Sequence, residues 1–167
     1  MMDIKPVENY GAGLVAVRPM RERVNRLESV LLTMPQVDCP IRHHFAPGMY
    51  AREITIPAGT VVTGAVHKTE NLIIVSMGRL RIVTEDGTRE VVAGDTVTCK
   101  AGMKNAVVAL EDSRWTNFMA NPENITDTDK LVELLTESTS DELLGGSKNK
   151  QLQTNKAALL EASWHSD

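Results

Sequence analysis

The chain has 167 residues, of which 42% are apolar, 24% are charged and 4% are aromatic, and its formal net charge is −4. This length suits one domain with extensions, which can bury a core without the help of a disulfide or a metal ion. The acidic balance and the six aromatic residues argue against nucleic-acid binding, which needs a basic surface or stacking rings.

Charge divides the chain into three segments with different characters. Residues 1–40 are neutral, residues 41–120 carry a net charge of +1, and residues 121–167 carry a net charge of −5. We therefore expect three parts: an N-terminal arm and helix (1–40), a β-rich domain (41–120) and an acidic helical tail (121–167).

One helix is predicted in the first segment, between Pro19 and Pro35. Proline is favoured in the first turn of a helix, and the apolar residues that follow recur at three- and four-residue spacing. These residues are Val24, Leu27, Val30, Leu31 and Met34. Residues 1–17 show no such period, and we expect them to form an extended arm.

The middle segment consists of short runs rich in Val, Ile and Thr, separated by turn residues, which is typical of strands. The pair Asp86-Gly87 between two of these runs indicates a hairpin. Eight short strands at regular spacing predict a sandwich or a small barrel. The predicted strands are 49–56, 60–67, 72–76, 80–84, 88–92, 96–99, 105–110 and 115–120, and the aromatic residues expected to fill the core are Phe45, Tyr50, Trp115 and Phe118.

The last segment returns to a helical pattern. Residues 126–129 offer N-terminal caps for a helix whose apolar residues are Leu131, Val132, Leu134 and Leu135. A further short helix is predicted over Asn155–Ser163. Helices this short are marginal in isolation, so we expect them to dock on another part of the protein.

The glycine spacing of the middle segment resembles the two sequence motifs of the cupin family. Gly59, His67 and Gly78 stand at the spacing of the first motif, and Gly94 and Gly102 stand at the spacing of the second. The resemblance covers about residues 41–120. It implies a mainly β fold, a cupin-like jelly-roll barrel, to which the N-terminal helix and arm and the C-terminal helical tail are added.

The same resemblance implies where a metal ion would be held. Cupins bind a divalent metal through three histidines and a glutamate, and this chain has Ala65, His67, Asn71 and Asn105 at those positions. Glu70 adjoins Asn71, but a shift of one residue on a strand turns a side chain to the other face. We therefore expect no catalytic residue, no cofactor and no tightly bound metal. His67, Asn71 and Asn105 are then candidates for the lining of a barrel pocket, and a weakly bound divalent cation is the alternative.

His43 and His44 form a second candidate cluster. Neighbouring residues on a strand face opposite ways, so only one of the two could join His67 in a two-histidine site. The preferred interpretation is that both are hydrogen-bonded residues at the start of a strand and at an interface. Four arginines are interpreted as part of a solvated strand face rather than as a site for an acidic partner: Arg52, Arg79, Arg81 and Arg89.

The segments 42–53 and 63–70 also resemble small cupin-type proteins encoded by tailed bacteriophages. The favoured hypothesis is a non-catalytic jelly-roll subunit of an assembly such as a phage particle, in which copies of the chain form a dimer or larger homo-oligomer. Its two ends would clamp neighbouring copies and other assembly proteins, with Tyr10 and Trp164 as contacts. The alternatives are a cupin enzyme or a small-molecule or metal binder with a degenerate site around His67, and a regulator that binds a host protein.

Location follows from features that the sequence lacks. It has no run of about 18 apolar residues and no signal-peptide pattern at its N-terminus, so we expect a soluble protein of the host cytoplasm that can enter the virion. Cys39 and Cys99 stand in no metal-binding or redox spacing and are predicted to be buried, reduced thiols.

Overall fold

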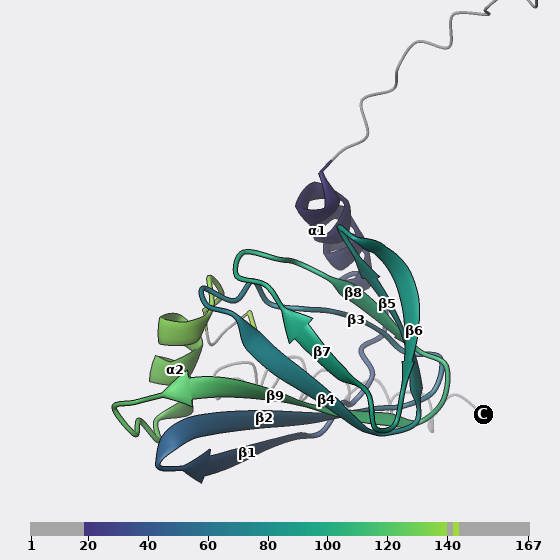
Figure 1. Ribbon diagram of the computed structural model, residues 1–167. Helices are drawn as coiled ribbons and strands as arrows, with labels where there is room; N and C mark the ends of the chain where they lie inside the picture. The colour runs from purple at the N-terminus through teal and green to yellow at the C-terminus, as the bar shows by residue number, and fades with distance from the viewer. Residues whose placement is uncertain (1–18, 140–141, 144–167) are drawn as a thin grey trace, which may run out of the picture.

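The computed structural model describes residues 19–139 and 142–143. Within them it has two antiparallel sheets and two helices (Figure 1). The larger sheet contains, in spatial order, β1 (Ile41–Ala46), β2 (Gly48–Ile56), β9 (Ser113–Asn121), β4 (Asn71–Met77) and β7 (Thr96–Cys99). The smaller sheet contains β3 (Val61–Thr63), β8 (Ala106–Ala109), β5 (Arg79–Thr84) and β6 (Gly87–Val92).

The order of the strands is that of a double-sheet jelly roll. The eight strands from β2 to β9 form two spatial rows, β2-β9-β4-β7 in the larger sheet and β3-β8-β5-β6 in the smaller sheet. Strand β1 extends the first row at the edge beside β2. Closing two sheets in this way protects their edges. The predicted mainly β fold, with a helix before the sheets and a short helix after them, is confirmed.

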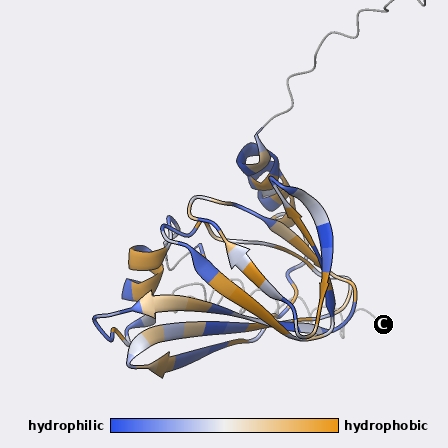
Figure 2. Cartoon of the chain, in the orientation of Figure 1, coloured by the Kyte–Doolittle hydropathy of each residue, from blue (hydrophilic) through white to orange (hydrophobic). Residues whose placement is uncertain are grey.

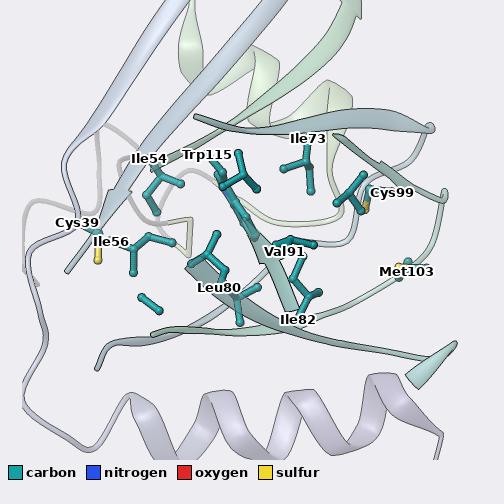
Figure 3. Close-up of a cluster of buried hydrophobic side chains, with 14 residues drawn as sticks. Cys39, Ile54, Ile56, Ile73, Leu80, Ile82, Val91, Cys99, Met103 and Trp115 are labelled. Atoms are coloured by element: carbon teal, nitrogen blue, oxygen red, sulfur yellow. The ribbon is translucent and has the colours of Figure 1, made fainter. Parts of the chain in front are cut away.

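The core lies between the two sheets and follows from the alternation along each strand. On β4 the buried residues Ile73 and Val75 alternate with exposed ones, and on β5 Leu80 and Ile82 do the same. Hydrophobic and hydrophilic segments accordingly follow one another along the strands (Figure 2). The inward side chains meet Trp115 in one cluster (Figure 3). Each fully buried aliphatic side chain of this kind contributes roughly 1.5–3 kcal/mol.

Both helices begin as their sequences predict. Helix α1 (Met20–Leu31) starts directly after Pro19, and α2 (Thr128–Leu135) starts after Asp127, whose carboxylate accepts hydrogen bonds from the backbone N–H groups of residues 129 and 130. Helix α2 packs Leu131 and Leu135 against the larger sheet. Neither described helix is long or apolar enough to cross a membrane. The predicted arm (1–17), the helix over Asn155–Ser163 and the proposed contacts Tyr10 and Trp164 lie outside the described residues.

Three details of the predicted strands are wrong. Strand β1 was not expected, because Arg42, His43 and His44 obscure its alternation. The run 60–67 is not one strand: β3 ends at Thr63, and His67 instead pairs with Thr136 beyond α2. Two aromatic residues do not fill the core as expected: Phe45 is 42% exposed on the edge strand β1, and Phe118 is only half-buried on β9, out of phase with the buried Trp115. An edge strand has a partner on one side only, and less of it is covered.

Candidate functional site

A cavity of about 740 Å³ lies between the inner face of the larger sheet, β3 and the two helices. Ile54, Trp115, Met119 and Leu131 make much of its wall apolar. Its polar side chains come from several elements and include Arg52, His67, Asn105 and Asn117. A smaller hollow of about 330 Å³ beside β5 to β7 shares Ile73, Cys99 and Asn105 with it.

Arg52 lines the cavity, although its sequence predicted a place on a solvated strand face. On β2 it alternates in phase with Tyr50 and Ile54, so its side chain lies on the inner face and lines the cavity. Burial lowers the pKa of the Arg52 guanidinium and the nearby Tyr50 raises it, but an arginine stays charged at neutral pH. The interpretation as a solvated strand face is therefore wrong for Arg52.

The other arginines of that group behave as expected. Arg79 and Arg81 lie on β5 and form exposed ion pairs with Glu90 of β6, at 3.6 Å and 2.7 Å. Arg89 is exposed on β6. Exposed pairs of this kind contribute at most about 1 kcal/mol, and they place no charge inside the barrel.

His67 stands in the connection between β3 and β4 and lines the cavity. Its carbonyl accepts a hydrogen bond of 2.8 Å from the backbone N–H of Gly102, and its backbone pairs with Thr136. Burial, followed by the positive charge of Arg52, lowers the pKa of His67 to about 4. The imidazole is therefore neutral at pH 7, and both neighbouring segments hold its backbone in place.

The predicted pocket residues Asn71 and Asn105 are both buried, and of the two only Asn105 lines the cavity. Asn71 accepts a hydrogen bond of 2.9 Å from Nδ2 of Asn117. Burial raises the pKa of the neighbouring Cys99 thiol, and a hydrogen bond with the Asn71 side chain opposes that shift. Cys39 and Cys99 are both buried thiols that form no disulfide with each other, as predicted.

Two buried polar atoms of the cavity wall have no hydrogen-bond partner within the described part of the chain: Oδ1 of Asn105 and Nε1 of Trp115. The Asn105 side chain lies directly over Gly64, where a Cβ atom would stand 2.3 Å from Oδ1. Buried polar atoms in folded proteins almost always have a partner. An acceptor and a donor left open in a cavity wall therefore indicate a place for a polar ligand or water.

His43 and His44 lie on opposite faces of β1, and the structure does not bring either to His67. Nδ1 of His43 is 2.7 Å from the Tyr50 hydroxyl oxygen, and the two rings stack. Burial, then the charges of Arg52 and His44, lowers the pKa of His43. Nε2 of His44 lies 3.6 Å from Glu53 on the outer face. Of the three histidines in the described ranges, only His67 lines the cavity.

The residues present do not fit the metal ion that the cupin resemblance implies. Among residues 19–139 and 142–143, no three His, Cys, Asp or Glu side chains come together. Of the four family positions, Ala65 has no ligand atom, and Oδ1 of Asn71 already accepts a hydrogen bond from Asn117. The charge of Arg52, which reaches His67, also opposes a second cation in the cavity.

Helix α1 and the chain after α2 form part of the cavity wall. Glu28 of α1 bonds to Nζ of Lys104 at 2.6 Å and accepts a hydrogen bond of 2.8 Å from the Thr63 hydroxyl. Arg21 of α1 forms an ion pair with Glu137. The backbone N–H of Glu137 in turn donates to the carbonyl of Val66. These contacts join segments that are far apart in the sequence, and no local pattern predicted them.

Comparison with known proteins gives no match to a family model and none to a curated protein. The structure is similar to that of a cupin superfamily protein from Desulfitobacterium hafniense (11% identity, TM-score 0.42, covering 52% of this chain and 83% of that one). It is also similar to that of KdgF from Halomonas sp. (18% identity, TM-score 0.45, covering 55% of this chain and 90% of that one). A third similar structure is that of a cupin domain of an XRE family transcriptional regulator from Enterobacter cloacae (12% identity, TM-score 0.44, covering 50% of this chain and 97% of that one). Likeness this distant carries no argument about the site, and the fold assignment rests on the order of the strands.

Proposed function

We propose that this chain binds a small organic molecule in its barrel cavity, without a metal ion and without transforming it. The observation that carries this proposal is the pair of open polar atoms, Oδ1 of Asn105 and Nε1 of Trp115, in the wall of a cavity of about 740 Å³. Sites for small molecules are of this size, largely apolar, and contain a few polar groups that fix orientation.

The side chains of the cavity favour binding over catalysis. His67, with a pKa of about 4, is a weak general base at neutral pH. The raised pKa of the Cys99 thiol keeps it protonated, and a thiol is a much poorer nucleophile than a thiolate. The two groups that could otherwise start a reaction are therefore held in their unreactive forms.

Tryptophan fluorescence tests this proposal because the chain contains only two tryptophans. In a Trp164→Phe variant the whole emission comes from Trp115 in the cavity wall. We expect members of a panel of small organic acids, amides and amines to change this emission saturably and to raise the melting temperature. Protein purified without chelators should hold less than a tenth of an equivalent of iron, manganese, nickel or zinc. A stoichiometric metal that is lost on His67→Ala, together with no response to the panel, would overturn the proposal.

A second candidate function is the assembly subunit, and one surface favours it. The end of α1 and the connection to β1 expose four apolar side chains, each about half accessible: Val30, Leu32, Met34 and Val37. Contiguous exposed apolar residues frequently mark protein–protein contacts. The resemblance to phage-encoded proteins suggests that the assembly would be a phage particle.

The oligomeric state tests the assembly role. Light scattering should give a dimer or larger species for the full chain and a monomer for a Leu32→Ser, Met34→Ser variant. Mass spectrometry of purified virions should detect the chain if the particle is of phage origin. A strict monomer at micromolar concentration that is absent from virions contradicts this role and leaves the binding role untouched.

A further inference from the structure

Two side chains of the cavity wall are buried and each leaves one polar atom without a partner among the described residues. Asn105 is 7% exposed and Trp115 is 6% exposed, and the open atoms are Oδ1 and Nε1. Asn105 directly precedes β8 of the smaller sheet, whereas Trp115 lies on β9 of the larger sheet and belongs to the core cluster (Figure 3). The cavity wall therefore has one open polar atom beside each sheet.

The two atoms require opposite hydrogen-bonding groups. The indole Nε1 of Trp115 carries a hydrogen and can only donate, so its partner must be an acceptor. Oδ1 of Asn105 can only accept, so its partner must be a donor. A ligand that fills the cavity and leaves one of these atoms open should bind more weakly, by a factor of roughly 5 to 150, than one that satisfies both.

The backbone beside Asn105 fixes where its amide group stands. The Asn105 carbonyl accepts a hydrogen bond of 3.0 Å from the backbone N–H of Gly64, the residue directly after β3. The Asn105 side chain occupies the space in which any other residue at position 64 would carry its Cβ atom. The acceptor is thus held in place before a ligand arrives, which lowers the entropic cost of binding.

The charged groups that line the cavity are equal in number. The imidazole of His67 is neutral at pH 7 because burial and then the charge of Arg52 lower its pKa to about 4. The other ionisable lining residues of the described ranges are three cations and three carboxylates: Arg21, Arg52, Lys104, Glu28, Glu137 and Glu142. The lining thus has no excess of either sign with which to replace the hydration that a charged ligand loses on entry. An uncharged ligand loses much less on entering.

We propose that the ligand is an uncharged carboxamide, with at least one N–H group, on an apolar body. Its carbonyl oxygen accepts a hydrogen bond from Nε1 of Trp115, and its N–H group donates to Oδ1 of Asn105. A single hydroxyl oxygen would have to lie within about 3 Å of both atoms, whereas the oxygen and the nitrogen of an amide each reach only one. The body packs against Ile54, Met119 and Leu131, which line the same cavity. This inference rests on the proposed binding function and adds the chemical class of the ligand.

Isosteric probes test the donor separately from the acceptor. Compounds with phenylpropanoyl, cyclohexylpropanoyl and hexanoyl bodies are each measured as the N-methyl amide, the methyl ester and the carboxylate, by titration calorimetry on the full chain at pH 7. The ester keeps the carbonyl acceptor and has an oxygen in place of the N–H group. We expect at least one amide to bind about ten-fold or more tightly than its ester, and to exceed its carboxylate by a similar factor.

Variants assign each half of the amide to its partner. Asn105→Leu removes the acceptor, so the affinity of the amide should fall to that of the ester, which should change by less than about two-fold. Trp115→Phe removes the donor and keeps an aromatic ring, so it should weaken amide and ester alike, by about five-fold or more, and leave their ratio unchanged. The matched control is Asn25→Leu, because Asn25 lines the cavity from α1 but is exposed, and it should change neither affinity.

The outcomes separate this inference from the function on which it rests. If amide and ester bind equally in the unaltered protein, or the carboxylate binds more tightly than both, the chain binds small molecules but this recognition is wrong. The inference also fails if no probe of the series binds while a member of the wider panel does. If neither the series nor the panel changes Trp115 emission or the melting temperature, the binding function fails too. If Asn105→Leu does not fold, the ratio of amide to ester affinity in the unaltered protein and in Trp115→Phe decides.

Discussion

Arg52 of β2 and His67 of the β3–β4 connection line the same cavity, where burial and then the charge of Arg52 keep the His67 imidazole neutral. Burial is the larger cause and the guanidinium the next, and together they lower the pKa of His67 to about 4. The Arg52 guanidinium stays charged at neutral pH. His67 contributes a neutral ring that can donate or accept one hydrogen bond.

The lowered pKa of His67 makes the stability of the protein depend on pH. In the unfolded chain the imidazole titrates near 6.5, so below that pH the unfolded state takes up a proton that the native state does not. The free energy of unfolding should therefore fall by about 2 kcal/mol between pH 7 and pH 5, and the loss should be complete below about pH 4. Urea unfolding followed by circular dichroism measures it.

A His67→Gln variant gives the control for this effect. In this variant the unfolding free energy should change much less between pH 7 and pH 5. The change that remains should come from His43, whose pKa is also lowered. An unchanged pH dependence in His67→Gln would show that His67 is accessible to protons in the native state.

The close approach of Asn105 to Gly64 predicts a steric defect. A Cβ atom at position 64 would stand 2.3 Å from Oδ1 of Asn105, so Gly64→Ala should displace that side chain and lower the unfolding free energy by about 1–3 kcal/mol. In a double-mutant cycle, adding Asn105→Ala should restore part of the loss, because it removes the clashing atom. Strictly additive effects would place the defect elsewhere.

The bond between Glu28 and Lys104 fixes α1 over the cavity. The Lys104 side chain is only 11% exposed, so Glu28→Gln leaves a nearly buried ammonium group without its carboxylate. We expect a loss of about 2 kcal/mol, between the values for exposed and buried pairs. Glu90→Gln in the exposed pair with Arg81 is the matched control, and its loss should be clearly smaller because water screens that pair. Equal losses in the two variants would contradict this account of α1.

The N-terminal cap of α2 can be tested in the same way. The Asp127 carboxylate accepts from the backbone N–H groups of Asp129 and Lys130, at 3.0 Å and 3.2 Å. Asp127→Ala should lower the unfolding free energy by about 1 kcal/mol, whereas Asp127→Asn should be nearly neutral because asparagine caps equally well. If Asp127→Ala has no effect on thermal unfolding, α2 is held by its packing on Tyr50 and Met119 alone.

Local patterns in the sequence predicted the helices and most strands because their signals are local. Pro19 and Asp127 mark the helix starts, and the alternation of β4 and β5 marks their buried faces. Strand β1 was not predicted because an edge strand buries few of its side chains, and three polar residues interrupt its apolar alternation. The strand predicted over 60–67 ends early because the partner of His67 is Thr136, some seventy positions away.

The candidate site was predicted less well, for a similar reason. The family motifs directed attention to His67, Asn71 and Asn105, of which His67 and Asn105 line the cavity. Arg52 was missed although a signal existed: it is in phase with Tyr50, Ile54 and Ile56, which are all buried. An arginine is usually exposed, so its residue type outweighed its position in the strand. The covering of the cavity by α1 depends on contacts such as Glu28 with Lys104, which only the folded chain brings together.

The most direct test of the central claim is a crystal structure of the protein with the small molecule that raises its melting temperature most. We predict electron density for that molecule inside the barrel, with polar atoms within about 3 Å of Oδ1 of Asn105 and Nε1 of Trp115 and no metal ion beside it. Density outside the cavity, or a molecule bound through a metal ion held by His67, would contradict the account.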